Sequence, residues 1–308
     1  MSWSKTYDGP EPVRINKWLA LEGVCSRREA DALIEQGLVQ LNGKVVTELG
    51  ERIGPGQTIC LTAKASRQLD NQLSVILNKP AGFVSGTPEA GETPAVRLIT
   101  EQRLFGQAPA IPGRSSKLAP LGRLDKDSRG LLILSEDGVL AKAIIGPLSE
   151  VDKEYIVKVG GEITEEKLKL LRHGLELDGR KLRPAKVNAE GRGTLRFVLN
   201  EGRNRQIRRM CSLVRLKVLD LQRIRVGPVE LGNLPEGRWR ALSHKERAAL
   251  IAMSKTQPAA KQKSRRAPAA TLASDPAPKP PYRPKKDGPR GEKFKRTKLP
   301  PRPRSAIR

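Results

Sequence analysis

The sequence is poor in the residues that build metal and redox centres. It has only two histidines, His173 and His244, and three isolated cysteines, Cys25, Cys60 and Cys211. Cysteines that are odd in number and without a CxxC pair suit a reduced cytoplasm and argue against structural zinc. Aromatic residues make up only 3% of the chain. We therefore expect no metal and no cofactor, and chemistry that rests on carboxylate, tyrosine, lysine or arginine side chains.

Long apolar segments are also missing. Residues 1–12 are polar and lack an apolar signal core. The longest apolar run is far shorter than the roughly 20 residues that span a bilayer. We therefore expect a cytoplasmic protein without a membrane partner.

Positive charge, in contrast, is abundant. The formal net charge of +25 predicts a polyanionic partner, most simply nucleic acid. Charge alone does not distinguish RNA from DNA or from an anionic membrane surface.

Charge and proline divide the chain. Residues 258–308 hold 8 Lys, 8 Arg and 3 acidic residues, so 16 − 3 = +13 of the charge lies there, together with 11 of the 24 prolines. Such a segment buries too little surface to offset its chain entropy, so residues 254–308 are predicted to be a disordered tail. Two interpretations of this tail stay open: a non-specific electrostatic tether for RNA, or a solubilising extension.

Residues 13–62 are predicted to form a small module of two helices and a short sheet. Ser26 and Glu29 are spaced as a capping box, and Gly37 can end the helix that they begin. The Asn42-Gly43 dipeptide is typical of a tight β-hairpin. Arg27 and Arg28 stand at the helix N-terminus, where backbone donors and guanidinium groups favour phosphate. A solvated helix end is the plainer interpretation of the two arginines.

This pattern, with SRREADALIEQGLVQLNGK at its centre, resembles the S4 RNA-binding domain first known from ribosomal proteins. The resemblance covers most of residues 13–60 and implies that Arg27 and Arg28 contact RNA.

A larger unit, residues 73–253, follows a polar linker predicted at 63–72. It opens with an apolar strand at 73–77. Its most informative segment is GRLDKDSRGLLIL, in which charged residues including Asp125 and Asp127 directly precede an apolar strand. Catalytic groups are often placed on a loop held by a rigid strand. Taken alone, the segment is more simply a charged turn that leads into a core strand.

Four ordered segments resemble the motifs of the pseudouridine synthases. They are LNKPAGFVSGT, GRLDKDSRGLLILSEDG, KEYIVKV and EGRNRQIRRMC, and GRWRAL closes the domain. The resemblance covers about residues 70–250 and points to the RsuA family, the branch that carries an N-terminal S4 domain and modifies ribosomal RNA. The segment NRQIRRM resembles the RluF branch more closely than the RsuA branch. The long loop at 106–120 has no place in the family pattern, so its role stays open.

The resemblance implies a catalytic set. Asp125 is the catalytic carboxylate, Arg208 holds it ionised, and Tyr155 stacks on the uracil and assists proton removal from C5. Alternation puts Tyr155 on the face of Val157 and Val159, as it would for a plain core tyrosine. Helical periodicity over 203–216 alone would place Arg208 away from the apolar side, so its position in the cleft rests on the resemblance. The remaining residues implied to contact RNA or wall the base pocket are Arg123, Leu124, Lys126, Arg205, Gln206 and Ile207.

The sequence therefore predicts an α+β protein. A small S4 module precedes a mixed, largely antiparallel sheet domain with flanking helices, and the basic tail follows. We expect a monomeric pseudouridine synthase whose partner is structured RNA, with 23S ribosomal RNA as the first candidate. Small-subunit ribosomal RNA and a tRNA anticodon arm stay open as substrates. An S4-type ribosome-associated factor without catalysis, or a basic nucleic-acid chaperone, is the alternative from another class.

Overall fold

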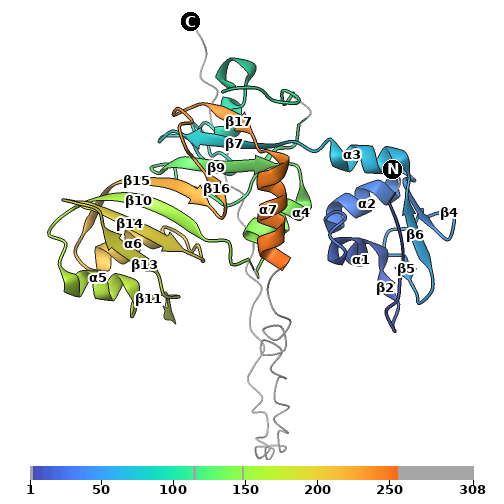
Figure 1. The fold of residues 1–308 in the computed structure, drawn as a ribbon, viewed down its shortest axis with the longest axis horizontal. Coiled ribbons are helices and arrows are strands. Elements are labelled where there is room, and N and C mark those ends of the chain that lie inside the picture. The colour runs from blue at the N-terminus through green and yellow to red at the C-terminus, as the bar shows by residue number, and fades with distance from the viewer. Residues whose placement is uncertain (1–2, 114–115, 148, 256–308) are drawn as a thin grey trace, which may run out of the picture. The chain divides into compact units, whose positions relative to one another are not determined.

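The computed structural model of the chain describes residues 3–113, 116–147 and 149–255 (Figure 1). All but the first two residues of the tail predicted at 254–308 lie outside the described residues, as does Leu148.

The N-terminal module has the predicted helices and hairpin. Its four-stranded sheet has the order β1-β6-β3-β4, and β2 pairs with β5. The elements are β1 (Ser4–Thr6), β2 (Val13–Arg14), α1 (Ile15–Leu21), α2 (Arg27–Glu35), β3 (Val39–Leu41), β4 (Lys44–Val45), β5 (Arg52–Ile53), β6 (Thr58–Leu61) and α3 (Ala63–Asp70).

Local sequence explains how α2 and the hairpin form. The Ser26 hydroxyl accepts from the Glu29 backbone N–H, and the Glu29 carboxylate accepts from the Ser26 N–H, which is the predicted capping box. Gly37 follows the helix with φ +67°, and Asn42 and Gly43 turn the hairpin with φ +49° and +79°. The segment predicted at 63–72 as a polar linker forms α3 for most of its length, capped by Thr62.

The larger part of the chain is built on one nine-stranded sheet. Its main path has the order β13-β14-β10-β15-β9-β7-β17, with β16 paired to β15 and β8 paired to β9. The strands are β7 (Ser74–Lys79), β8 (Ala119–Pro120), β9 (Arg129–Ser135), β10 (Lys153–Gly160), β13 (Lys186–Ala189), β14 (Thr194–Leu199), β15 (Lys217–Val226), β16 (Val229–Glu230) and β17 (Trp239–Ala241).

Helices cover both faces of this sheet. The helical elements are η1 (Ala95–Leu98), η2 (Glu101–Arg103), α4 (Gly138–Ile145), α5 (Glu165–Arg172), α6 (Gln206–Leu213) and α7 (His244–Lys255), and a separate hairpin joins β11 (Glu176–Leu177) to β12 (Arg180–Lys181).

Strand β9 lies in the interior of the sheet and separates two cores. Leu132 and Leu134 pack with side chains of α5 and α6, whereas Leu131 and Ile133 pack with side chains of α4 and α7. Successive strand residues point to opposite faces, so an unbroken apolar run is what a strand buried on both sides requires.

The predicted fold class is confirmed. Within the nine-stranded sheet β15 and β9 run parallel and the other pairs are antiparallel, so the sheet is mixed and largely antiparallel. Two predicted elements have other bounds. The strand expected to stop at residue 77 continues to Lys79, and the helix expected over 203–216 spans Gln206–Leu213.

Candidate active site

One row of paired residues crosses the sheet beneath the site. Tyr155 on β10 pairs with Arg223 on β15, Arg223 pairs with Gly130 on β9, and Gly130 pairs with Lys79 on β7. Paired residues of neighbouring strands project to the same face, here the face that α6 covers. The row therefore gathers a tyrosine and two cations from four strands that are distant in the sequence.

A glycine is required at residue 130 because the backbones of β9 and β15 approach each other closely there. Its φ is +103°, and a Cβ atom there would lie 2.2 Å from the carbonyl oxygen of Arg223. Any side chain would therefore force β9 and β15 apart at the point where they carry the site.

Asp125 stands on the loop that delivers the chain into β9. Ser85 holds this loop, because its hydroxyl donates to the Leu124 carbonyl at 2.8 Å and accepts from the Leu124 N–H at 3.1 Å. Gly82 N–H donates to the Lys126 carbonyl at 2.7 Å, and Ser128 N–H donates to the Asp125 carbonyl at 3.0 Å. The LNKPAGFVSGT segment thus supports the loop that carries the predicted catalytic carboxylate.

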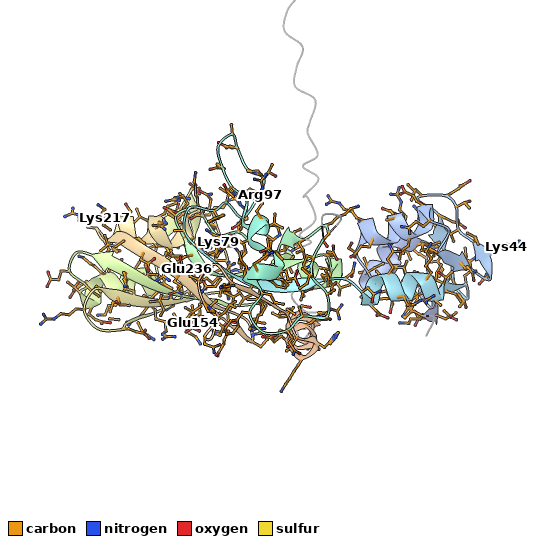
Figure 2. All side chains as sticks on the ribbon, turned by 90° about the horizontal axis from the view of Figure 1, so that it is seen from above. Lys44, Lys79, Arg97, Glu154, Lys217 and Glu236 are labelled. Carbon is orange, nitrogen blue, oxygen red and sulfur yellow. The ribbon has the colours of Figure 1, made fainter. Side chains whose placement is uncertain are left out.

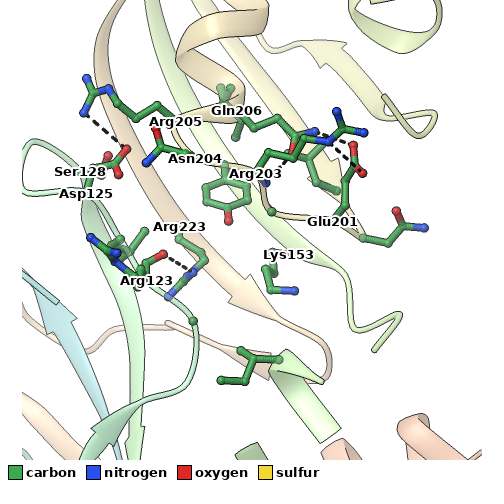
Figure 3. A pocket seen from close by; sticks show the side chains of 18 of the residues that line it. Arg123, Asp125, Ser128, Lys153, Glu201, Arg203, Asn204, Arg205, Gln206 and Arg223 are labelled. Carbon is green, nitrogen blue, oxygen red and sulfur yellow. Dashed lines mark hydrogen bonds and ion pairs between the residues drawn. The ribbon is translucent and has the colours of Figure 1, made fainter. Parts of the chain in front are cut away.

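A pocket of about 530 Å³ opens beside this loop (Figure 3). Asp125, Tyr155 and Arg208, the predicted catalytic set, all line it. Its volume lies within the range of small-ligand sites, so a single nucleotide fits. The other lining residues used below are Arg123, Leu124, Ser128, Lys153, Glu201, Arg203, Arg205, Gln206, Ile207 and Arg223.

The ion pair expected between Arg208 and Asp125 is not formed. Arg208 Nη2 instead donates to the Asp127 carbonyl at 2.8 Å and to the Ser128 hydroxyl at 3.1 Å, and lies 3.4 Å from the Asp127 carboxylate. The cation paired with Asp125 is Arg205, at 3.6 Å. Arg205 has φ +48° at the start of α6 and reaches the carboxylates from there, whereas Arg208, one turn into the helix, meets the backbone of the 127–128 turn.

Arg205 also binds Asp127 with both terminal nitrogens, at 3.1 and 2.9 Å. These hydrogen bonds, followed by the charges of Arg208 and Arg205, lower the pKa of the Asp127 carboxyl below its ordinary value, although burial opposes them. The loop carboxylates and the α6 arginines therefore form one charged cluster.

Tyr155 and Ile207 line the pocket from the side of the core. Tyr155 is 9% exposed and lies in the same apolar cluster as Val157 and Ile207. Leu124 belongs to this cluster as well. These three side chains can wall an apolar, aromatic ring such as a nucleobase.

The other residues predicted to contact RNA differ in accessibility. Arg123 and Lys126 are exposed, and Lys126 pairs with Glu92 at 3.1 Å. Gln206 is buried, and its amide donates to Glu201 at 3.0 Å and accepts from the Arg203 N–H at 2.9 Å. Gln206 therefore holds the start of α6 rather than projecting outward. In the N-terminal module Arg27 and Arg28 are exposed at the first turn of α2.

Sequence reasoning missed several cations of this region, among them Arg183 and Arg203, which line the pocket. Lys79 is 0% exposed and donates to the carbonyls of Pro80 and Phe83; Figure 2 shows it inside the domain, whereas Lys217 projects from the edge. Burial lowers the pKa of Lys79 to about 8, although the charges of Asp127 and Asp125 act against this. Lys153 and Arg223 line the pocket. Among Lys79, Lys153 and Arg223, the sequence pattern indicated a place near the site for Lys153 alone, because strand alternation puts it on the face of Tyr155.

Within the described ranges, no three His, Cys, Asp or Glu side chains gather as a metal site would require. The same ranges contain no helix with the length and apolarity needed to cross a membrane.

Comparison with known proteins agrees with this geometry. The family described as RNA pseudouridylate synthase matches residues 73–213, and the S4 domain matches residues 13–59. The chain is 36% identical over 262 residues to the dual-specificity RNA pseudouridine synthase RluF of Escherichia coli K12, which covers 83% of this chain and 86% of that protein. It is 36% identical over 243 residues to an uncharacterized RNA pseudouridine synthase of Aquifex aeolicus, covering 78% and 94% of the two chains.

A solved structure extends the likeness to the fold. A crystal structure of a pseudouridylate synthase superposes with a TM-score of 0.53 at 27% identity, covering 77% of this chain and 99% of that one.

A pseudouridine synthase fold behind an S4 domain defines an enzyme that isomerises uridine in RNA. The chain belongs to the RsuA family of S4-domain RNA pseudouridine synthases.

Proposed function

We propose that the protein converts a uridine of 23S ribosomal RNA to pseudouridine, with Asp125 as the catalytic carboxylate. The observation that carries the proposal is the place of Asp125. It lines a nucleotide-sized pocket opposite an aromatic ring and beside arginines. Such a pocket can hold an extruded base against a carboxylate that pairs with an arginine.

The reaction suits these side chains. The glycosidic bond from C1′ to N1 breaks and a bond from C1′ to C5 forms. The proton on C5 leaves and N1 takes up a proton, so the product is an isomer with no net redox change. A carboxylate acting as nucleophile or as base begins this sequence. Tyr155 stacks on the uracil and assists removal of the C5 proton.

Arg205 and Arg208 act differently on the loop that carries Asp125. Arg205 lies 3.6 Å from Asp125 and supplies charge, whereas Arg208 holds the 127–128 turn through the Asp127 carbonyl and the Ser128 hydroxyl. In this proposal Arg208 is a positioning residue for the loop of Asp125. Arg123 enters the space that the extruded base leaves, and Lys126 meets the neighbouring backbone. Extrusion itself costs a few kcal/mol.

The S4 module brings the RNA to this site. We propose that residues 13–62 bind structured RNA through Arg27 and Arg28, that residues 73–253 carry out the reaction, and that the protein acts as a monomer in the bacterial cytoplasm. The relative from Escherichia coli bears the name dual-specificity, which supports a second class of target besides 23S ribosomal RNA. A tRNA anticodon arm and small-subunit ribosomal RNA are the candidates.

Tritium release from RNA labelled at C5 of uridine tests the chemistry. The wild type should release tritium, and Asp125→Asn should release none while it binds RNA within a few-fold of the wild type. Asp127→Asn is the matched control, and it should keep measurable turnover because only one loop carboxylate reacts. Pseudouridine formed by Asp125→Asn would contradict the assignment. A wild type that binds RNA and releases no tritium would favour the S4-type binding factor.

The target is found by mapping pseudouridine in total RNA from cells with and without the gene. Loss of one 23S position in the deleted strain supports the proposed substrate. Loss confined to 16S ribosomal RNA or tRNA would replace that substrate and leave the chemistry unchanged.

A further inference from the structure

Seven cations line the pocket, and they fall into a group that pairs with carboxylates and a group that does not. Arg205 pairs with Asp127 at 2.9 Å, and Arg203 pairs with Glu201 at 3.7 Å. Arg208 also pairs with Asp127, at 3.4 Å. The other cations of the pocket form no ion pair with a carboxylate in the part of the chain that the structure describes, and they are Arg123, Lys153, Arg183 and Arg223. Of these, Lys153 and Arg223 stand on the neighbouring strands β10 and β15. Figure 3 shows these two side chains on the opposite side of the pocket from Arg203 and Arg205.

Arg223 is buried, and one of its three guanidinium nitrogens has no hydrogen-bond partner among the described residues. It is 1% exposed, its Nε donates to the Leu131 carbonyl at 2.7 Å, and its Nη1 lies 3.4 Å from the Arg123 carbonyl. Its Nη2 has no hydrogen-bond partner among the described residues. Nε and Nη1 thus contact the chain on either side of Asp125, and Nη2 remains for a ligand. A buried donor left unpaired is costly, so such an atom calls for a partner.

Lys153 lies beside Arg223 on the same face of the sheet. It stands two residues before Tyr155 on β10, and Tyr155 pairs with Arg223. Its Nζ donates to the Val151 carbonyl at 2.9 Å. Burial and then the charge of Arg223 lower the pKa of Lys153 to about 8, although Asp152 acts in the other direction.

The opposite face of the same strands is built differently. There Glu154 binds both Arg225 and Arg196, and Asp152 binds Arg225 at 2.9 Å. Arg225 and Arg196 on that face are neutralised by carboxylates of the protein, whereas Lys153 and Arg223 are not. Two adjacent cations, one buried and one partly buried, repel each other, and an anion between them removes that repulsion.

We propose that Lys153 and Arg223 form a subsite that binds a phosphate of the RNA strand at the target uridine. The inference rests on the proposed function, because the base occupies the neighbouring part of the pocket between Asp125 and Tyr155. A guanidinium arm and an ammonium together match a phosphate, which accepts charge-assisted hydrogen bonds from both. A uracil carbonyl would satisfy one donor and leave both charges uncompensated. The subsite therefore anchors the extruded nucleotide by its backbone while the ring turns.

The first test uses inorganic phosphate and needs no turnover. Lysine labelled with ¹³C at Cε reports each ammonium by NMR, and Lys153→Gln identifies the Lys153 signal by its loss. Phosphate, compared with chloride at equal ionic strength, should raise the pKa of Lys153 by about 1. Lys158 is exposed on the same strand and serves as the control, whose NMR signal should not respond to phosphate. An unchanged pKa of Lys153 in phosphate would overturn the subsite.

The second test uses the mapped RNA hairpin with single methylphosphonate links that remove one phosphate charge at a time. Lys153→Gln should raise KM about tenfold or more, as expected for a lost charge-assisted hydrogen bond, and Lys158→Gln should leave KM unchanged. Neutralising one phosphate next to the target should raise KM for the wild type and have little further effect in Lys153→Gln. Additive losses at every link would contradict the proposal.

The tests separate the two ideas. If the wild type forms pseudouridine and Lys153→Gln has the kinetics of Lys158→Gln, the subsite is wrong and the proposed function stands. If the wild type forms none, the proposed function fails, and the NMR titration alone decides whether the subsite binds phosphate. Arg223→Lys, which keeps the buried charge, should likewise raise KM because it loses the unpaired Nη2 donor.

Discussion

Arg208 reaches the loop of the catalytic carboxylate through Asp127 and not through Asp125. One terminal nitrogen of Arg208 lies 2.8 Å from the Asp127 carbonyl oxygen and 3.4 Å from its carboxylate. The charge beside Asp125 comes from Arg205, one turn earlier. Arg205 therefore pairs with both carboxylates of the loop and Arg208 with Asp127, so substitutions of the two arginines should have different effects.

Arg208→Lys should lower kcat about tenfold or more. Lysine keeps the charge but lacks the guanidinium that places Nη2 between the Asp127 carbonyl and the Ser128 hydroxyl, and about 1.4 kcal/mol of lost transition-state stabilisation is a factor of ten. RNA affinity should change little, because other cations contact phosphate. Single-turnover kinetics with filter binding measures both quantities.

The matched control is Arg209→Lys. Arg209 is the next residue of α6 and pairs with Asp178 outside the pocket, so this variant should react at the wild-type rate. Normal turnover in both Arg208→Lys and Arg208→Ala would show that Arg208 has no role in positioning the loop.

Gly130→Ala should destabilise the protein by about 3 kcal/mol or more, because the added methyl group meets the Arg223 backbone at a φ that alanine avoids. Urea unfolding measures the change. Gly179→Ala is the control: its φ is also positive, at +67°, but nothing lies within 4 Å of the added atom. Equal losses in the two variants would mean that backbone conformation alone, and not the approach of β9 to β15, makes glycine necessary at residue 130.

Lys79 should make stability depend on pH above about 8. Its pKa is lowered to about 8 in the folded protein, from an ordinary value of 10.5. Below pH 8 both states hold the proton, so this group adds no pH dependence. Between 8 and 10.5 the unfolded chain binds more protons, so the free energy of unfolding rises with pH.

The comparison with Lys79→Met isolates this effect. Between pH 7.5 and 9.5 the wild type should gain about 1–2 kcal/mol relative to the variant, since each pKa unit corresponds to about 1.4 kcal/mol. Lys153 also has a pKa lowered to about 8, but it is present in both proteins and cancels. Parallel pH profiles would show that Lys79 titrates at its ordinary pKa.

Deletion of residues 258–308 should weaken RNA binding and flatten its salt dependence. The deletion removes +13 of the net charge of +25, so fewer counterions are released on binding. Site choice should stay the same, because phosphate contacts position RNA without specifying a sequence. Binding isotherms at several salt concentrations, with pseudouridine mapping of the products, provide the measurement. A different modified nucleotide after truncation would show that these residues read the target.

Local patterns determined most of the fold. The Ser26 capping box, the Asn42-Gly43 turn and the alternation that buries Tyr155 with Val157 depend on residues close together in the chain, so spacing alone predicted them. The predicted catalytic residues followed from motifs, and the structure brings Asp125, Tyr155 and Arg208 to one pocket. In the segment predicted as a polar linker, 63–72, Thr62 caps the helix α3.

The tertiary structure alone decided which charges meet. Arg205 and Asp127 are separated by 78 residues, and nothing in their own segments says that they pair rather than Arg208 and Asp125. Arg223 lies in an ordinary strand by sequence, and its burial beside Gly130 follows from the parallel pairing of β15 with β9. Helical periodicity sets the direction of a side chain from its own axis, but the neighbour it meets depends on the register of strands distant in the sequence.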